Sequence, residues 1–271
     1  TEDVFSENII EEYNWAAGAE FADSVGADVI SSSLGYSDFD DSTASHTYAD
    51  MDGNTCPSSI AADIAFSKGI LVVTSAGNSG NNFWHYISAP ADGDSVLAVG
   101  AVDSDGNYVS FSSYGPSSDG DIKPNVAAKG ANATVADPFG TIGGANGTSF
   151  SCPILAGAAT CLLQAHPGKS VLEVKNAIER SANYFNTPTD TLGYGIPNFG
   201  NAHFILSGIE DRENIIPLII YPNPILENLY LQIFTYSNEA VKIQMIDLLG
   251  KVVAKSEFNT FMVGYNIIDF P

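Results

Sequence analysis

Two consecutive units, each a helix followed by an apolar strand, constrain the fold of this chain more than any other feature of its sequence. They span residues 6–35 and 59–77. In both units a glycine, Gly26 or Gly69, stands where a helix can end in the left-handed conformation. Strands that follow one another through a helix form a parallel sheet with helices on both faces. The sequence therefore predicts an α/β architecture.

The buried face of the first helix is predicted from its apolar spacing. Ile10, Tyr13, Ala17 and Phe21 fall on one face of a helix that Ser6 can cap. We expect this face to pack against the sheet.

Runs of apolar residues and turn-forming residues predict the other elements. Buried strands are expected over residues 29–35, 96–102 and 108–113, the last two joined by an Asp-Gly turn at 103–107. A helix over residues 149–165 is apolar nearly all round, so we expect it to be buried.

The chain is predicted to contain two domains. From about residue 214, apolar and polar residues alternate with a period of two between Asn, Gly and Pro turns, as in short strands. We therefore expect a large α/β domain over residues 1–206, a linker over 207–215 and a small all-β, sandwich-like domain over 216–271.

The three cysteines are too few for a disulfide framework. Cys152 and Cys161 lie on opposite faces of one predicted helix, roughly 13 Å apart at about 1.5 Å per residue, so they cannot bridge each other. Cys56 lies in a predicted loop. We expect all three to be free, with Cys152 and Cys161 buried.

The charge balance excludes some partners. The formal net charge is −22, from 10 basic and 32 acidic residues, so nucleic acid and anionic membrane surfaces would repel the chain. No apolar run is long enough to span a bilayer, which indicates a soluble globular protein without a transmembrane segment. Residues 50–54 and 103–107 are Asp-rich but lack the other spaced ligands of a calcium loop. We expect turns there and no metal site, with calcium as the alternative.

Ser149 stands in a run of small residues, GANGTSFSCP, that leads directly into a helix. Unpaired N–H groups and the helix dipole at a helix start favour negative charge, as an attacking alkoxide and the resulting oxyanion require. Gly147 leaves room for a substrate, and Pro153 falls in or near the first turn, where a missing N–H matters least. The pattern suits a nucleophile. The alternative is a Ser/Thr cap on a buried helix.

Asn78 follows the second apolar strand and an Ala-Gly pair. Its side-chain amide is suited to donate to a developing oxyanion, beside the backbone N–H of Ser149. The alternative is an asparagine that only shapes a turn.

Three motifs in this order resemble the subtilisin-like serine proteases. They are Ser33-Leu34-Gly35, Ala76-Gly77-Asn78, and Asn146-Gly147-Thr148-Ser149 followed by Pro153. The resemblance covers residues 1–206, the C-terminal two-thirds of a catalytic domain. It implies part of a three-layer parallel-sheet fold and peptide hydrolysis through an acyl-enzyme on the motif serine.

The resemblance also implies how a peptide is held. Two strand ends become the backbone walls of the primary specificity pocket, with room between them and edges that can pair with an extended chain. Tyr36 stands where many relatives have a second glycine. A large apolar residue before the scissile bond is expected. The substrate-binding residues so assigned are Ser33, Leu34, Gly35, Ser75, Ala76, Gly77 and Thr148.

The base of the triad is not found in this chain. The family's order is Asp in D-[ST]-G, His in H-G-T, then Ser, and neither of the first two patterns occurs in the sequence. His46, His85, His166 and His203 are followed by Thr, Tyr, Pro and Phe, and we interpret all four as structural. The triad Asp and His are expected upstream of Thr1, so the chain alone is expected to be inactive.

The C-terminal segment resembles the sorting domain of type IX (Por) secretion substrates in its runs over residues 221–224, 247–251 and 266–269. This implies export across the outer membrane, a secreted or cell-surface location and the secretion machinery as a partner. The alternative is a β appendage that acts as an adhesion or carbohydrate module.

These patterns predict a secreted serine endopeptidase with polypeptide substrates. The competing hypothesis is a catalytically inactive peptide-binding or cell-surface protein that keeps the groove.

Overall fold

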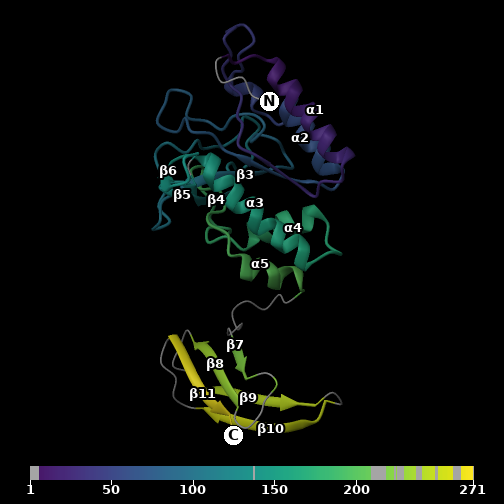
Figure 1. Cartoon of the computed structure of the whole chain (residues 1–271), viewed down its shortest axis with the longest axis vertical. Helices are drawn as coiled ribbons and strands as arrows, with labels where there is room; N and C mark the ends of the chain where they lie inside the picture. Colours follow the sequence, from purple (N-terminus) through teal and green to yellow (C-terminus); the bar gives the residue numbers. More distant parts are fainter. Residues whose placement is uncertain are drawn as a thin grey trace. The chain divides into compact units, whose positions relative to one another are not determined.

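The computed structural model describes residues 6–136, 138–208, 218–222, 224, 229–235, 240–247, 250–258 and 264–270 (Figure 1). The chain divides into two compact units, Thr1–Glu210 and Asp211–Pro271. Each unit is described by itself. The predicted linker, 207–215, lies outside the described residues from position 209 onward.

A four-stranded parallel sheet forms the centre of the first unit. Its strands are β1 (Val29–Ser32), β2 (Leu71–Ser75), β3 (Leu97–Val102) and β4 (Val126–Lys129), in that spatial order. Because neighbouring strands run in the same direction, their carboxyl ends meet at one edge of the sheet.

Helices cover both faces of this sheet (Figure 1). On one face lie α1 (Ile10–Ser24) and α2 (Pro57–Ser67). On the other, α3 (Thr148–Ala165) contacts all four strands and is flanked by α4 (Val171–Arg180) and α5 (Phe199–Leu206). The predicted three-layer α/β fold is confirmed.

Strand β2 shows how the two layers are separated. All five of its residues are buried. Leu71 and Val73 pack in the cluster that contains α3, whereas Val72 packs in the cluster that contains α1 and α2. Alternation of side chains along a strand therefore divides one run of apolar residues between two cores.

Shorter elements complete the first unit. A single 3-10 turn, η1, spans Tyr48–Asp50. Strands β5 (Ala133–Ala136) and β6 (Ile142–Ala145) pair antiparallel immediately before α3. Backbone φ angles of +76° at Gly26 and +94° at Gly69 confirm the predicted left-handed positions just after α1 and α2.

The second unit is all β, as predicted. Strands β7, β8 and β11 form one antiparallel sheet, and β9 pairs with β10. Buried residues of β8 and β11 meet partly buried residues of β9 and β10 in one apolar cluster. The bounds are Leu218–Tyr221 for β7, Leu229–Thr235 for β8, Val241–Ile246 for β9, Val252–Phe258 for β10 and Gly264–Phe270 for β11.

The predicted buried face of α1 is wrong. Ile10, Tyr13 and Phe21 are 58%, 55% and 68% exposed, and Ala17 is also exposed. The helix begins at Ile10, and its N-cap residue is Ile9 rather than Ser6.

Buried hydrogen bonds decide which face of α1 is turned inward. The Trp15 indole N–H donates to Ser32 Oγ at 2.9 Å. The Glu12 carboxylate accepts from the N–H and hydroxyl of Ser58. These specific bonds fix the rotation of the helix, and apolar spacing alone does not reveal them.

Two predicted strands also differ from the structure. Strand β1 ends at Ser32 rather than residue 35, and Val29 and Ile30 are only half-buried because this strand is paired on one side among the described residues. Residues 108–113 form no strand, although the Asp-Gly turn before them is present. The Tyr108 hydroxyl donates to the Ser112 carbonyl, and Ser113 Oγ accepts from the Ser79 N–H.

Helix α3 is buried on one side only. Leu155, Ala159 and Leu162 face the sheet, while Ile154 and Cys161 are exposed. The prediction that Cys161 is buried is therefore wrong, because its small and apolar neighbours lie at a surface.

We expect alkylation of the native protein to modify Cys161 and to spare Cys56 and Cys152. All three thiols are free, but the last two are fully buried. Burial raises the pKa of Cys152 to about 11, and burial together with nearby carboxylates raises that of Cys56, so neither carries the reactive thiolate at neutral pH. Mass spectrometry before and after unfolding measures this. Native modification of Cys152 would contradict the packing of α3 on the sheet.

Candidate active site

The site lies at the carboxyl edge of the parallel sheet, where α3 begins. Residues 33–35 leave β1 and residues 76–78 leave β2 at this edge. Ser149 is the second residue of α3, and its carbonyl accepts a hydrogen bond from Ser33 Oγ at 3.1 Å. Three segments that are far apart in sequence therefore meet here.

Thr148 connects α3 to the end of β2. Its N–H and its hydroxyl both donate to Asn78 Oδ1, at 2.8 and 3.0 Å. Its hydroxyl also accepts from the N–H of Gly77 at 3.2 Å. Since the backbone N–H of Thr148 can only donate, the amide oxygen of Asn78 must face it.

The Nδ2 group of Asn78 therefore faces away from the Thr148 N–H and can donate to another acceptor. This nitrogen lies 3.6 Å from the point where a Cβ on Gly147 would stand. Among the described residues, no acceptor is hydrogen-bonded to the Ser149 N–H. The Ser149 N–H and Asn78 Nδ2 are thus two donors at the start of α3, where negative charge is favoured, and Ser149 itself is half-buried.

Pro153 lies in the second turn of α3, close to the first turn as predicted. A residue at this position would normally donate its N–H to the carbonyl of Ser149, four residues earlier. Proline has no N–H, and Ser33 Oγ supplies the missing donor. The proline thereby leaves the Ser149 carbonyl open to a bond that anchors it to the end of β1.

The two predicted walls are held close together by small residues. A Cβ on Gly35 would lie 3.3 Å from Ser88 Cβ, and one on Gly77 would lie 2.8 Å from Ser113 Oγ and 3.4 Å from Ser88 Oγ. Ser88 and Ser113 are buried. Sequence analysis missed both serines, because they belong to other loops and carry no motif of their own.

Tyr36 does not intrude between these walls. Its backbone pairs with Ala89 in an isolated antiparallel bridge, and its side chain is 1% exposed. The ring stacks on Phe39 within the core beneath α1 and α2.

The four histidines are engaged away from Ser149. His46 contacts Glu12, and His166 Nε2 lies 2.9 Å from His203 Nδ1. His85 contacts the Phe83 carbonyl at 3.0 Å and packs against the rings of Tyr86 and Tyr114. None of the four is hydrogen-bonded to Ser149 in the described part of the chain.

The Asp-rich segments form turns, as predicted. Asp52 accepts from the N–H groups of Asn54 and Thr55, and Asp103 accepts from those of Asp105 and Asn107. Hydrogen bonds from Asn107 lower the pKa of Asp103, which keeps the carboxylate charged in its turn.

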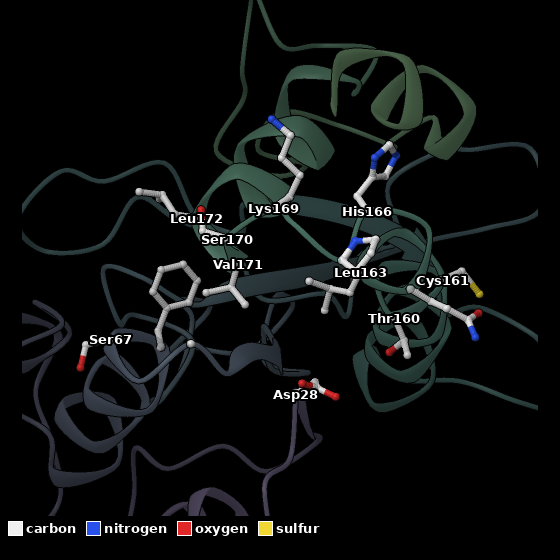
Figure 2. A pocket seen from close by; sticks show the side chains of 14 residues that line it. Asp28, Ser67, Thr160, Cys161, Leu163, His166, Lys169, Ser170, Val171 and Leu172 are labelled. Carbon is white, nitrogen blue, oxygen red and sulfur yellow. The ribbon is translucent and has the colours of Figure 1, made fainter. Parts of the chain in front are cut away.

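A cavity of about 870 Å³ lies at the opposite end of α3 from Ser149 (Figure 2). Asp28 from the start of the sheet lines it together with Cys161 and His166. At about 1.5 Å per residue, His166 is about 25 Å along the helix from Ser149. This cavity is separate from the candidate active site.

The fold and the site together define a class of protein: a parallel α/β domain that presents a serine and an amide donor at its carboxyl edge. The model of the Subtilase family matches residues 2–196, and the chain belongs to that family. The model of the Secretion system C-terminal sorting domain matches residues 219–269.

Curated relatives agree with the family assignment. Subtilisin DY of Bacillus licheniformis is 38% identical over 167 residues, which are 61% of this chain and 53% of the relative. Subtilisin NAT of Bacillus subtilis subsp. natto is 37% identical over 175 residues, 64% of this chain and 40% of the relative. The chain thus spans about half the length of the curated relatives that it matches.

Solved structures show the same fold. The self-cleaved protease domain of PatA aligns with a TM-score of 0.58 and 27% identity, over 73% of this chain and 68% of that one. The PatG macrocyclase in complex with peptide aligns with a TM-score of 0.59 and 24% identity, over 73% and 57%.

The sorting-domain match and the subtilisin relatives identify a secreted or cell-surface protein. Within the described residues, one helix, α3, is long and apolar enough to cross a membrane by length and composition. Seven of its residues are buried in the protein core.

We expect Gly77→Ala to destabilise the protein by about 1–3 kcal/mol. Gly77 has a φ of +108°, and an added Cβ would meet Ser113 Oγ at 2.8 Å. Gly157→Ala is the matched control, because Gly157 is exposed on α3 with nothing within 4 Å of its Cβ position. Alanine should stabilise a helix there by about 0.5–1 kcal/mol. Denaturant unfolding measures the change in the free energy of unfolding for both variants. Equal changes would contradict the steric conflict expected at Gly77.

Proposed function

We propose that this chain is the nucleophile-bearing part of a serine endopeptidase. The observation that carries the proposal is the pair of hydrogen bonds from Thr148 to Asn78 Oδ1, which turns one amide donor toward the start of α3. Family membership supports the reaction class. Asn78 then has a catalytic use for its Nδ2, beyond shaping a turn.

In the proposed mechanism, Ser149 Oγ attacks the carbonyl carbon of a peptide bond while a general base takes its proton. The carbonyl oxygen becomes an oxyanion that accepts hydrogen bonds from Asn78 Nδ2 and the Ser149 N–H. Collapse of the intermediate expels the amine, which receives the proton, and leaves an acyl-enzyme. Water then hydrolyses this ester by the same steps.

The general base is proposed to come from sequence outside these 271 residues. A serine hydroxyl needs an adjacent base to react at a useful rate. The histidines of the chain lie in other contacts: an ion pair for His46, aromatic packing for His85, and mutual contact for His166 and His203. The competing function is peptide binding without catalysis. The histidine contacts would favour that function if no base exists outside this sequence.

The proposed substrate is an extended polypeptide. Its backbone would pair with residues 33–35 and 75–77, and Thr148 would lie beside the scissile bond. Gly35 and Gly77 carry no side chain that would occupy the place of the substrate, and Ser88 and Ser113 pack directly against them. We propose that the substrate has a large apolar residue before the scissile bond.

The second unit is proposed to recruit a secretion machinery. The family description of residues 219–269 names a sorting domain of a secretion system, and its all-β structure is compatible with an independent recognition module. The boundaries 1–206, 207–215 and 216–271 remain our proposed domain limits.

We expect the 271-residue chain to react slowly with a fluorophosphonate probe, and the chain extended by its natural upstream sequence to react rapidly at Ser149. The difference follows from the need for a base. Labelling is followed by gel fluorescence and peptide mapping, with Ser149→Ala as the control that abolishes it. Rapid labelling of the short chain would place a base within it, whereas an unreactive, folded extended chain would favour the peptide-binding alternative.

In the active extended protein, Asn78→Ala should lower kcat by about 10²–10³-fold with little change in KM, the range found for the oxyanion amide of subtilisin itself. Asn82→Ala, on an exposed turn of the following loop, is the matched control and should leave kcat unchanged. A change in KM alone would argue that Asn78 only shapes the groove.

A further inference from the structure

Three side chains of metal-ligand type converge beneath α1, on the side of the sheet opposite α3. Glu12 comes from α1, His46 from the loop after β1, and Cys56 from the residue just before α2. One carboxylate oxygen, one imidazole nitrogen and the sulfur all lie within 4.8 Å of one another. Glu12 and Cys56 are fully buried, and His46 is partly buried.

We propose that Glu12, His46 and Cys56 bind one Zn²⁺ ion. The proposal is independent of the proposed peptidase activity. Carboxylate oxygen, imidazole nitrogen and thiolate sulfur are the three ligand types of protein zinc sites, whereas calcium and magnesium take oxygen ligands.

The spacing suits a tetrahedral ion after a small adjustment. Zinc bonds of about 2.0–2.3 Å place neighbouring ligand atoms about 3.3–3.7 Å apart. His46 Nε2 and Glu12 Oε1 are in direct hydrogen-bond contact, so they must separate by about 1 Å, and the sulfur lies within 4.8 Å of both. Three protein ligands leave the fourth tetrahedral position to water, as in other zinc sites with three protein ligands.

The surroundings orient the ligands as the outer shell of a metal site does. Glu12 Oε2 accepts from Ser58 N–H at 3.1 Å and from Ser58 Oγ at 2.7 Å, which leaves Oε1 directed toward His46. The His46 ring packs edge-on against Phe39, with centroids 5.5 Å apart. Second contacts of this kind fix ligand orientation and raise metal affinity.

The local charge also favours a cation. Besides Glu12, the carboxylates of Asp50, Asp52 and Asp92 act on Cys56, and Asp92 is buried. His46 contacts the Glu12 carboxylate within the cluster. Zinc displaces the thiol proton of Cys56 and the second imidazole proton of His46, when that ring is charged, so binding releases up to two protons and adds no net charge.

The simpler alternative is an ion pair between Glu12 and His46 with Cys56 as a buried bystander. The two hypotheses differ in the role of sulfur. Metal binding requires the thiolate, whereas the ion pair does not involve it. The role of sulfur is therefore the quantity to measure.

The test uses the full 271-residue chain, cleared of metal by a chelator and titrated with Co²⁺ and with Zn²⁺. We expect one equivalent of metal, a thiolate-to-cobalt charge-transfer band, and a higher Tm with zinc. Cys56→Ser should abolish the band and weaken zinc binding by at least about tenfold. Cys161→Ser, which removes the exposed thiol of α3, is the matched control and should change neither.

His46→Asn keeps all three thiols and should also lose the band, so the test stands even if Cys56→Ser fails to fold by circular dichroism. Cobalt bound without a charge-transfer band, a band that survives Cys56→Ser, or a band lost in Cys161→Ser would each overturn the proposal. Absence of stoichiometric binding at micromolar zinc would leave the ion pair as the function of the cluster.

Discussion

Thr148 joins the start of α3 to the end of β2 through three hydrogen bonds, and the position of Ser149 follows from them. The threonine hydroxyl accepts from one wall of the groove and donates to the amide oxygen of Asn78. A side chain without a hydroxyl would leave both the Gly77 N–H and half of the Asn78 contact without a partner. The same residue therefore sets the helix start, the wall and the orientation of the amide donor.

Pro153 and Ser33 provide a second attachment at the same place. An uninterrupted helix would use its own N–H to satisfy the carbonyl of Ser149, and nothing would then tie that carbonyl to β1. The proline removes this internal donor, and the serine at the end of β1 replaces it. A local defect in the helix is thus converted into a tertiary contact, so that Ser149 is held from both neighbouring strand ends.

The sequence predicts the layers well because they depend on local periodicity and on glycine positions. It predicts the rotation of α1 poorly, because Trp15 and Glu12 are oriented by Ser32 and Ser58, which are distant in sequence. It also places Ser33, Asn78 and Ser149 at one edge, since strand ends and a helix start are visible as motifs. Ser88 is not predicted, because its role depends on its contacts with Gly35 and Gly77, which only the folded structure shows.

The division of β2 between two cores has a consequence for how this domain can change over time. Leu71 and Val73 belong to the layer that carries Ser149, and Val72 to the layer of α1 and α2. Substitutions that share no neighbours and lie on opposite faces of a sheet have nearly additive effects on stability. Helices α1 and α2 can therefore accumulate mutations, each with a small effect on stability, without compensating changes around Ser149. Selection therefore acts almost independently on substitutions in the two layers, although both belong to one chain.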